Sequence, residues 1–157
     1  MEQQPFQTME GQGFPTVRQL SVFLDNRVGQ LLRVTQVLDA TDVRILAFSI
    51  IDSVDCAVVR IVIDKPDEGI KALKEAGFAV SVAELLIVKM PHGKHGLRTI
   101  WTVLLSSEIN ISYAYPLLPG RVGLALAVAV DNIEFAVDTL QQRKLEVLSE
   151  RDLQDES

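Results

Sequence analysis

The sequence predicts an α+β protein made of two consecutive βαββαβ units. The first observation is an alternating apolar run that passes directly into a helical apolar pattern near Asp25. The second is that the whole pattern returns: Leu31 corresponds to Leu97, 66 positions later. Farther along, Asp64 corresponds to Asp131, 67 positions later, so one residue has been inserted between. The third is that no Gly/Ser-rich linker separates the copies, so one unit follows the other directly.

The first unit opens with a strand and a helix. Val17–Leu24 alternates as a half-buried strand does, and apolar residues over about Val28–Ala40 recur at three- and four-residue spacing. Two β-branched runs follow, Val43–Ile51 and Cys56–Ile63. A polar turn separates them, which predicts a hairpin.

A second helix is expected after this hairpin. Asp64 can cap it, Pro66 presets φ, and Asp67 places negative charge in the first turn. Gly77 gives the stop. The sequence therefore predicts a helix directly after the hairpin.

A long apolar stretch, Phe78–Met90, closes the first unit and opens the second. It exceeds a typical strand, so we divide it into two strands near Ala83 and Glu84. The expected division of the chain is a flexible arm at 1–16, a first domain at 17–83, a second domain at 84–153 and a tail at 154–157.

The second unit repeats the pattern, with the inserted residue near Pro119-Gly120. Apolar residues at helical spacing predict two helices. The face of the first consists of Leu97, Ile100, Trp101 and Leu104, and the face of the second consists of Ile133, Ala136, Val137 and Leu140. Asp131 with Glu134 resembles a capping box. Each unit is thus expected to be a ferredoxin-like sandwich, with two helices on one face of a four-stranded antiparallel sheet. We expect the two to pack as an internal pseudo-dimer, with the second strand of each unit at the contact, because edge strands carry unpaired backbone groups.

Composition excludes several classes of protein. The net charge of −6 and the pI near 4.9 disfavour nucleic-acid binding, which depends on basic patches. The apolar runs are too short to span a bilayer, and the first residues lack a signal-peptide pattern, so we expect a cytoplasmic protein without membrane contact. Cys56 is the single cysteine and has the pattern of a core residue.

The first strand-to-helix loop is the candidate ligand site. It comprises Asp25, Asn26, Arg27, Val28, Gly29, Gln30 and Leu31. Asn26 can cap the helix, and Gly29 lets another group approach the backbone. First-turn N–H groups then remain free for an anion such as a carboxylate. An ordinary capped turn is the alternative.

These residues resemble the ACT domain family. The family's loop typically reads Asn-Lys-Pro-Gly-Arg-Leu; here Arg27 matches the Lys, Gly29 the Gly and Leu31 the Leu, while Val28 replaces the Pro. The Val43-Arg44-Ile45 strand, the acidic hairpin turn and the Ala72–Phe78 ending agree with it. The two repeats look most like stand-alone tandem ACT proteins, relatives of acetolactate synthase regulatory subunits.

The resemblance implies allosteric sensing of an amino acid. The Gly29 loop would hold the ligand's carboxylate, and groups across an interface would take its ammonium and side chain. The expected groove lies between one unit's strand-helix loop and the neighbouring unit's second strand. In the first copy, Ser49 and Ile50 on that strand would offer a hydroxyl and carbonyls to the ammonium.

The second copy departs from the family pattern. His92, Lys94, His95, Gly96 and Leu97 form its loop, with His95 where the family has the first Gly. His95 would either hydrogen-bond a carboxylate or occlude the pocket. Two histidines without a third ligand are a weak metal signal, so we expect no metal and no cofactor.

Two tyrosines lie on the second strand of this copy. By period two, Tyr113 and Tyr115 share a face with Ile109 and Ile111. They either seal the sheet against the helices or help define the side-chain pocket.

Alternative functions have less support. Arg27 alone is thin support for a small acyl-phosphate hydrolase, because the chain shows no nucleophile-base pair, and no catalytic residues are expected. Single-stranded RNA binding needs stacking aromatics, which 56–62 lacks. The expected protein is therefore a non-catalytic amino-acid-binding regulator that forms a homodimer. The alternative is a subunit that docks onto a metabolic enzyme and binds no ligand.

Overall fold

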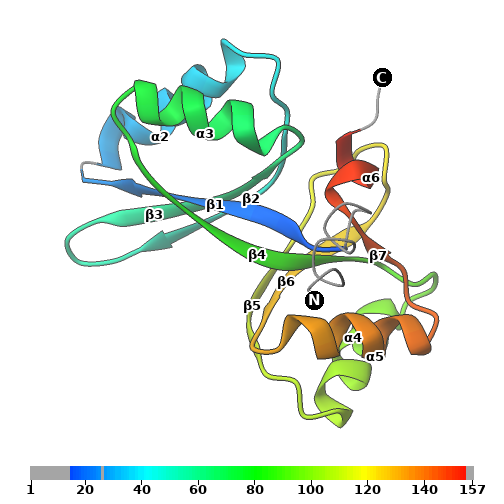
Figure 1. The fold of residues 1–157 in the computed structure, drawn as a ribbon. Helices are drawn as coiled ribbons and strands as arrows, with labels where there is room; N and C mark the ends of the chain where they lie inside the picture. The colour runs from blue at the N-terminus through cyan, green and yellow to red at the C-terminus, as the bar shows by residue number, and fades with distance from the viewer. Residues whose placement is uncertain (1–14, 26, 155–157) are drawn as a thin grey trace, which may run out of the picture.

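The computed structural model describes residues 15–25 and 27–154 of the 157. The elements follow in order along the chain (Figure 1): β1 (Val17–Leu24), α2 (Arg27–Asp39), β2 (Ile45–Asp52), β3 (Ala57–Ile63), α3 (Pro66–Glu75), β4 (Ala79–Lys89), α4 (Gly96–Ser106), β5 (Ile111–Pro116), β6 (Ala125–Val130), α5 (Ile133–Gln142), β7 (Val147–Leu148) and α6 (Glu150–Gln154). Among these described helices, none has the length and apolar character needed to cross a membrane. Most of the expected N-terminal arm lies outside the described residues.

The first unit is the predicted sandwich. Its strands lie in the order β2-β3-β1-β4, and α2 and α3 cover one face of the sheet (Figure 1). Alternate residues of β1, Leu20, Val22 and Leu24, are buried on that face with Leu38 and Leu73 of the helices. The alternating apolar residues of β1 and the helically spaced apolar residues of α2 thus pack in the same core.

The fourth strand differs from the prediction. β4 is one continuous strand of 11 residues, so the expected break near Ala83 and Glu84 is wrong. Its first part, up to Leu85, pairs with β1, and its last part, from Leu86, pairs with β6. The strand is long because it serves two sheets, and it carries the chain from one unit into the next without a linker.

The second unit repeats the arrangement around the end of β4. β6 and β7 flank β4, β5 pairs with β6, and α4 and α5 cover the outer face. The last strand is short, since β7 has two residues. A short helix, α6, follows it and was not predicted; five residues are too few for apolar periodicity to reveal a helix.

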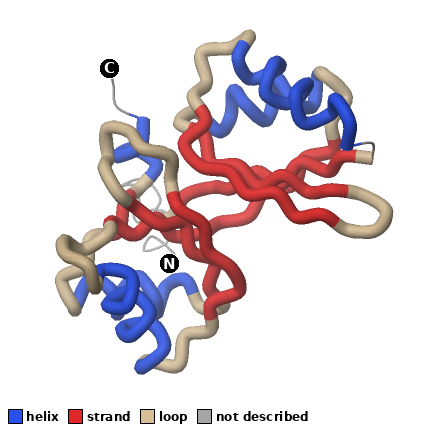
Figure 2. Tube along the Cα trace, turned by 180° about the vertical axis from the view of Figure 1, so that it is seen from behind, coloured by secondary structure: helices blue, strands red, loops and turns tan. Residues whose placement is uncertain are grey.

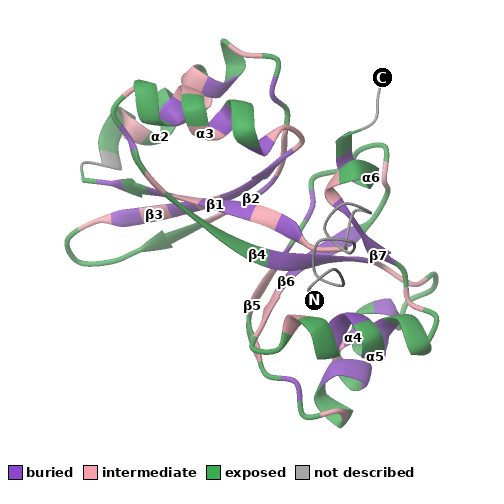
Figure 3. Cartoon of the chain, in the orientation of Figure 1, coloured by how far each residue is buried: buried purple, intermediate pink, exposed green. Residues whose placement is uncertain are grey.

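The units meet through the sheet faces that their helices leave open. α2 and α3 lie on one outer side of the molecule and α4 and α5 on the other, with the strands between them (Figures 1 and 2). A third apolar cluster fills the junction and includes Ala47, Leu85, Tyr115, Leu117 and Leu153. Figure 3 shows how burial continues along the second half of β4 into this region. The two units therefore share a core besides the two sandwich cores.

The expected contact between second strands is present but small. Ala47 and Leu117 form one antiparallel bridge, and the Leu118 N–H donates to the carbonyl of Leu46 at 2.8 Å. The shared strand β4, rather than edge pairing of β2 with β5, joins the sheets of the two units.

Two expected helix caps have another role. The carboxylate of Asp64 accepts the Arg44 N–H at 2.8 Å, and that of Asp131 accepts the Asn110 N–H at 3.2 Å. The residue that caps α5 is Asn132, which accepts from the Phe135 N–H. The repeat thus identified equivalent aspartates correctly, but each fastens the start of its unit's second strand instead of a helix.

Candidate functional site

The first strand-helix loop has an irregular backbone before the regular helix begins. β1 ends at the buried Leu24, and Val28 is extended, with φ −73° and ψ 118°. Gly29 follows with φ 84°, a left-handed conformation that side-chain-bearing residues rarely adopt. The regular turns of α2 therefore start at Gln30, two residues later than predicted. Asn26 lies outside the described residues, so the expected cap by its side chain is not described.

The surface of this loop is open and partly apolar. A Cβ built on Gly29 would meet no atom within 4 Å among the described residues. Val28 is 88% exposed and Leu32 61% exposed, while Leu31 is less so and Asp25 is exposed. Open space at Gly29 and exposed apolar side chains thus lie in the same loop, which suits contact with a ligand that has an apolar part.

Among the residues that the structure describes, the expected groove between this loop and the second unit is not formed. Val17, at one end of β1, pairs with Leu85, where β4 passes to the second unit. Leu24, at the other end, leads into the loop, which therefore lies at the far end of the first unit (Figures 1 and 2). Eight residues of strand, about 3.3 Å each, separate the two ends. The shared β4 holds the units in this arrangement, so β5 cannot supply the wall opposite the loop.

The candidate residues on β2 lie in the same unit as the loop but not beside it. Ser49 and Ile50 belong to an edge strand, and β3 separates β2 from β1. Ile50 is 46% exposed and its neighbour Phe48 is 48% exposed. This edge is thus available to another molecule along most of its length.

The loop of the second unit has one open and one packed glycine. Gly93 has φ 94°, and a Cβ built on it would meet no atom within 4 Å among the described residues. Gly96 is the first residue of α4 and is buried, and a Cβ there would lie 2.5 Å from the carbonyl oxygen of Pro91. His95 precedes it, and its carbonyl accepts from both the N–H and the hydroxyl of Thr99. The side chains of His92, Lys94 and His95 are exposed, and Leu97 is 43% exposed. Gly96 is thus packed against the loop backbone, whereas His95, at the position equivalent to Gly29, carries an exposed side chain.

The two tyrosines do not share a face with the isoleucines before them. The pairing of β5 with β6 shifts between Ile111 and Tyr113, which is a β-bulge. Ile109 and Ile111 pack in the helix-covered core, whereas Tyr113 and Tyr115 pack in the junction between the units. The expected shared face is therefore wrong, because period-two alternation does not survive the extra residue.

A buried polar cluster joins the tyrosines to the first unit. Gln19, which is 1% exposed, donates to the Tyr113 hydroxyl at 2.9 Å and accepts from the Tyr115 hydroxyl. The guanidinium of Arg60 lies 3.5 Å from the centre of the Tyr113 ring. Burial, and then the neighbouring Tyr113, raise the pKa of Tyr115 above its ordinary value. The sequence did not single out Gln19 or Arg60, because alternation places Gln19 on the face of β1 opposite to Leu20 and gives no sign that this face is covered.

A second polar contact at the junction involves α6. Arg18 on β1 donates to both carboxylate oxygens of Glu150, through its Nε at 2.9 Å and an Nη at 3.0 Å. Another Nη bonds Asp67 at 2.8 Å. The bonds to Glu150 and then to Asp67 raise the pKa of Arg18. These contacts fasten α6 of the second unit to β1 of the first.

A cavity of about 480 Å³ lies elsewhere, at the junction between the units. Residues from the start of β2, the turn after β3, the β5–β6 connection and α6 line it, and none of the predicted site residues is among them.

Comparisons with known proteins agree with this geometry. A family model described as an ACT domain pair matches residues 15–156. The crystal structure of protein BT0572 from Bacteroides thetaiotaomicron is similar, with 26% identity and a TM-score of 0.81, over 90% of this chain and 98% of that one. The regulatory subunit of aspartate kinase from Thermus thermophilus shares the fold at 12% identity, with a TM-score of 0.56 over 82% of this chain and 92% of that one. No curated protein matches the chain.

The family match covers every residue that the structure describes, and the two observed units are the expected antiparallel sheets, each with two helices on one face. The chain therefore belongs to the ACT domain family and carries a tandem pair of ACT domains.

Proposed function

We propose that this ACT domain pair is a non-catalytic regulatory protein that binds a small-molecule amino acid at the 25–31 loop. The observation that carries the proposal is the open backbone at Gly29, where a left-handed residue precedes the first regular turn of α2. The N–H groups of that turn, from Gln30 onward, would receive the ligand's carboxylate. Val28 and Leu32 would contact its side chain.

The second wall of this site requires another molecule. β5 of the same chain is too far from the loop, as the register of β1 indicates. We propose that a second copy supplies its β2 edge, so that Ser49 and Ile50 of that copy offer a hydroxyl and backbone carbonyls to the ammonium group. Edge strands with exposed Phe48 and Ile50 favour such pairing. The protein would then act as a cytoplasmic homodimer of two ACT domains per chain, at 17–83 and 84–153.

The regulatory role is supported by the family and by the kind of relative that shares the fold. Two similar structures are regulatory subunits of aspartate kinase, from Thermus thermophilus and Thermus flavus. By analogy, the ligand-bound dimer would act on a metabolic enzyme. Because Gly96 is packed against Pro91, the second loop, with His92, Lys94, His95 and Leu97, would bind ligand weakly or not at all.

Isothermal titration of the full chain with each of the twenty amino acids tests this proposal. Gly29→Val should abolish binding of whichever amino acid binds, because Val cannot hold φ near 84° without strain and would move the loop. Gly123→Val is the matched control, since Gly123 has φ 80° and equally open space but lies in the β5–β6 connection.

Three outcomes are informative. Binding lost in Gly29→Val and kept in Gly123→Val supports the loop site. Equal affinity in the wild type and Gly29→Val refutes it. Binding of none of the twenty, together with a stable complex with an enzyme, favours the docking subunit instead.

A further inference from the structure

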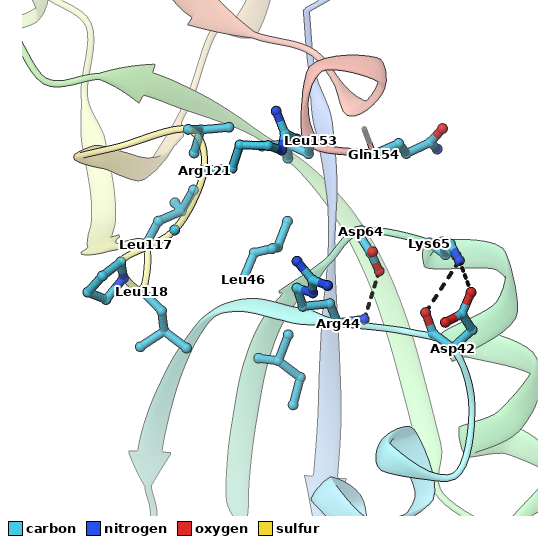
Figure 4. Close-up of a pocket in the computed structure, with 14 residues that line it drawn as sticks. Asp42, Arg44, Leu46, Asp64, Lys65, Leu117, Leu118, Arg121, Leu153 and Gln154 are labelled. Atoms are coloured by element: carbon cyan, nitrogen blue, oxygen red, sulfur yellow. Dashed lines mark hydrogen bonds and ion pairs between the residues drawn. The ribbon is translucent and has the colours of Figure 1, made fainter. Parts of the chain in front are cut away.

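The cavity at the junction is bounded by both units. β2 and the turn after β3 belong to the first unit, and the β5–β6 connection and α6 belong to the second. Figure 4 shows Arg44 and Leu46 in the middle, with Leu117, Leu118 and Arg121 on one side and Asp64 and Lys65 on the other. Its volume of about 480 Å³ lies within the range of small-molecule sites, roughly 300 to 1,000 Å³.

The charges around the cavity leave a small positive excess. Three cations, Arg44, Lys65 and Arg121, and two carboxylates, Asp42 and Asp64, line it, which gives a formal charge of +1 in a protein of −6. The lining of the cavity thus carries one formal positive charge, which one added negative charge would neutralise.

These charges are already partly engaged. Lys65 forms an ion pair with Asp42, which lowers the pKa of that carboxyl and raises the pKa of the ammonium. Asp64 accepts the backbone N–H of Arg44, and an Nη of Arg121 donates to the carbonyl of Asp152 at 3.1 Å. The guanidinium of Arg44, on an exposed residue, is the cation best placed to take a ligand.

The remaining lining is aliphatic. Leu46, Leu117, Val122 and Leu153 belong to or pack against the buried cluster between the units, and Leu118 is 43% exposed. An occupant would thus meet a guanidinium on one part of the wall and branched apolar groups on another. A dianion such as a phosphate monoester fits poorly, because Asp42 and Asp64 are near and the apolar walls could not contact it.

We propose that this junction cavity binds a small aliphatic monocarboxylate, with its carboxylate on Arg44 and its chain against the leucines. Guanidinium binds carboxylate in a bidentate, planar manner. The site is separate from the amino-acid loop, since no residue of 25–31 lines it. Its ligand touches both units at once, so occupancy would stabilise their junction and hold α6 in place.

Binding of 4-methylpentanoate to the full chain, followed by methyl NMR of labelled leucines, tests the proposal. Shifts are expected at the Leu46, Leu118 and Leu153 methyl groups. The neutral 4-methylpentanamide should bind at least about tenfold more weakly, because it cannot form the charge-assisted pair. Arg44→Gln should weaken the carboxylate by a similar factor, whereas Arg143→Gln, an equal charge change on an exposed residue after α5, should not.

A second variant separates shape from charge. Leu118→Trp keeps every cation and fills part of the cavity, so it should also block the probe. The proposal is overturned by equal affinity for the acid and the amide, by unchanged affinity in Arg44→Gln, or by the absence of shifts at these leucines up to about 10 mM probe. Gly29→Val should leave probe binding intact, so a failure here does not bear on the amino-acid loop.

Discussion

Replacing Gln19 by leucine should lower the free energy of unfolding by far more than the same substitution at an exposed position. Gln19 is 1% exposed and links both tyrosines of β5 to the first unit. The change removes two hydrogen bonds, each worth about 1 kcal/mol net. It also leaves the hydroxyl of Tyr115, on a residue 6% exposed, without its acceptor, which costs a further 1 to 3 kcal/mol or so. The expected loss in the free energy of unfolding is therefore about 3 to 5 kcal/mol.

Urea denaturation, followed by far-ultraviolet circular dichroism, measures this loss. Gln36→Leu is the matched control, because it makes the same chemical change at an exposed position of α2 and should cost no more than about 0.5 kcal/mol. Because β4 belongs to both sheets, the wild type should unfold in a single transition rather than one for each unit.

A double-mutant cycle measures the coupling energy between Gln19 and Tyr115. Tyr115→Phe alone leaves the carbonyl of Gln19 buried without its donor, but in Gln19→Leu with Tyr115→Phe neither partner remains. The double variant should therefore be more stable than the sum of the single losses predicts, by at least about 1 kcal/mol. Additive losses would refute the claim that these two side chains act as one buried pair.

Three other predictions concern the same chain. Burial raises the pKa of Tyr115, so the contribution of this tyrosine to stability is complete below the unfolded pKa near 10 and is lost as pH rises above that value. The urea midpoint should therefore fall between about pH 9 and 11, and it should fall less steeply in Tyr115→Phe. An equal slope in the two proteins would contradict this effect of Tyr115. Glu150→Gln should cost about 1 kcal/mol in urea unfolding, because it weakens a partly buried bidentate pair with Arg18; no loss at low salt would show that the pair contributes nothing. Gly96→Ala should cost about 1 to 3 kcal/mol, because the new Cβ would lie 2.5 Å from the Pro91 carbonyl oxygen, and a wild-type melting temperature would show that the loop relaxes freely.

Apart from the continuity of β4 and the presence of α6, the sequence alone was sufficient for the order of the helices and strands and for most of the helix-facing core. Leu20 and Val22 alternate, and Leu38 recurs at helical spacing, so local periodicity already shows which face is buried. The 66- and 67-residue offsets identified equivalent positions in the two units, including Asp64 and Asp131, whose side chains make the same kind of contact. These features follow from local pattern and repetition.

The errors share a physical cause. Whether 79–89 is one strand or two depends on its partners β1 and β6, which are distant in sequence. The bulge that turns Tyr113 away from the helices arises from the pairing of β5 with β6. The spacing of residues along the chain shows neither which distant strands pair nor where a bulge interrupts their pairing.

For the candidate site, the sequence identified Gly29 as the residue whose backbone opens the loop, and its φ of 84° agrees with that choice. Tertiary structure decided the rest. The shared strand β4 holds the loop at the end of the first unit that is far from the second unit, so the chain does not complete its own groove. The same arrangement brings Gln19, Arg60 and the two tyrosines together at the junction between the units. Local periodicity determines which residues form a helix or a strand and which face they bury, whereas pairing between distant strands determines what those faces meet.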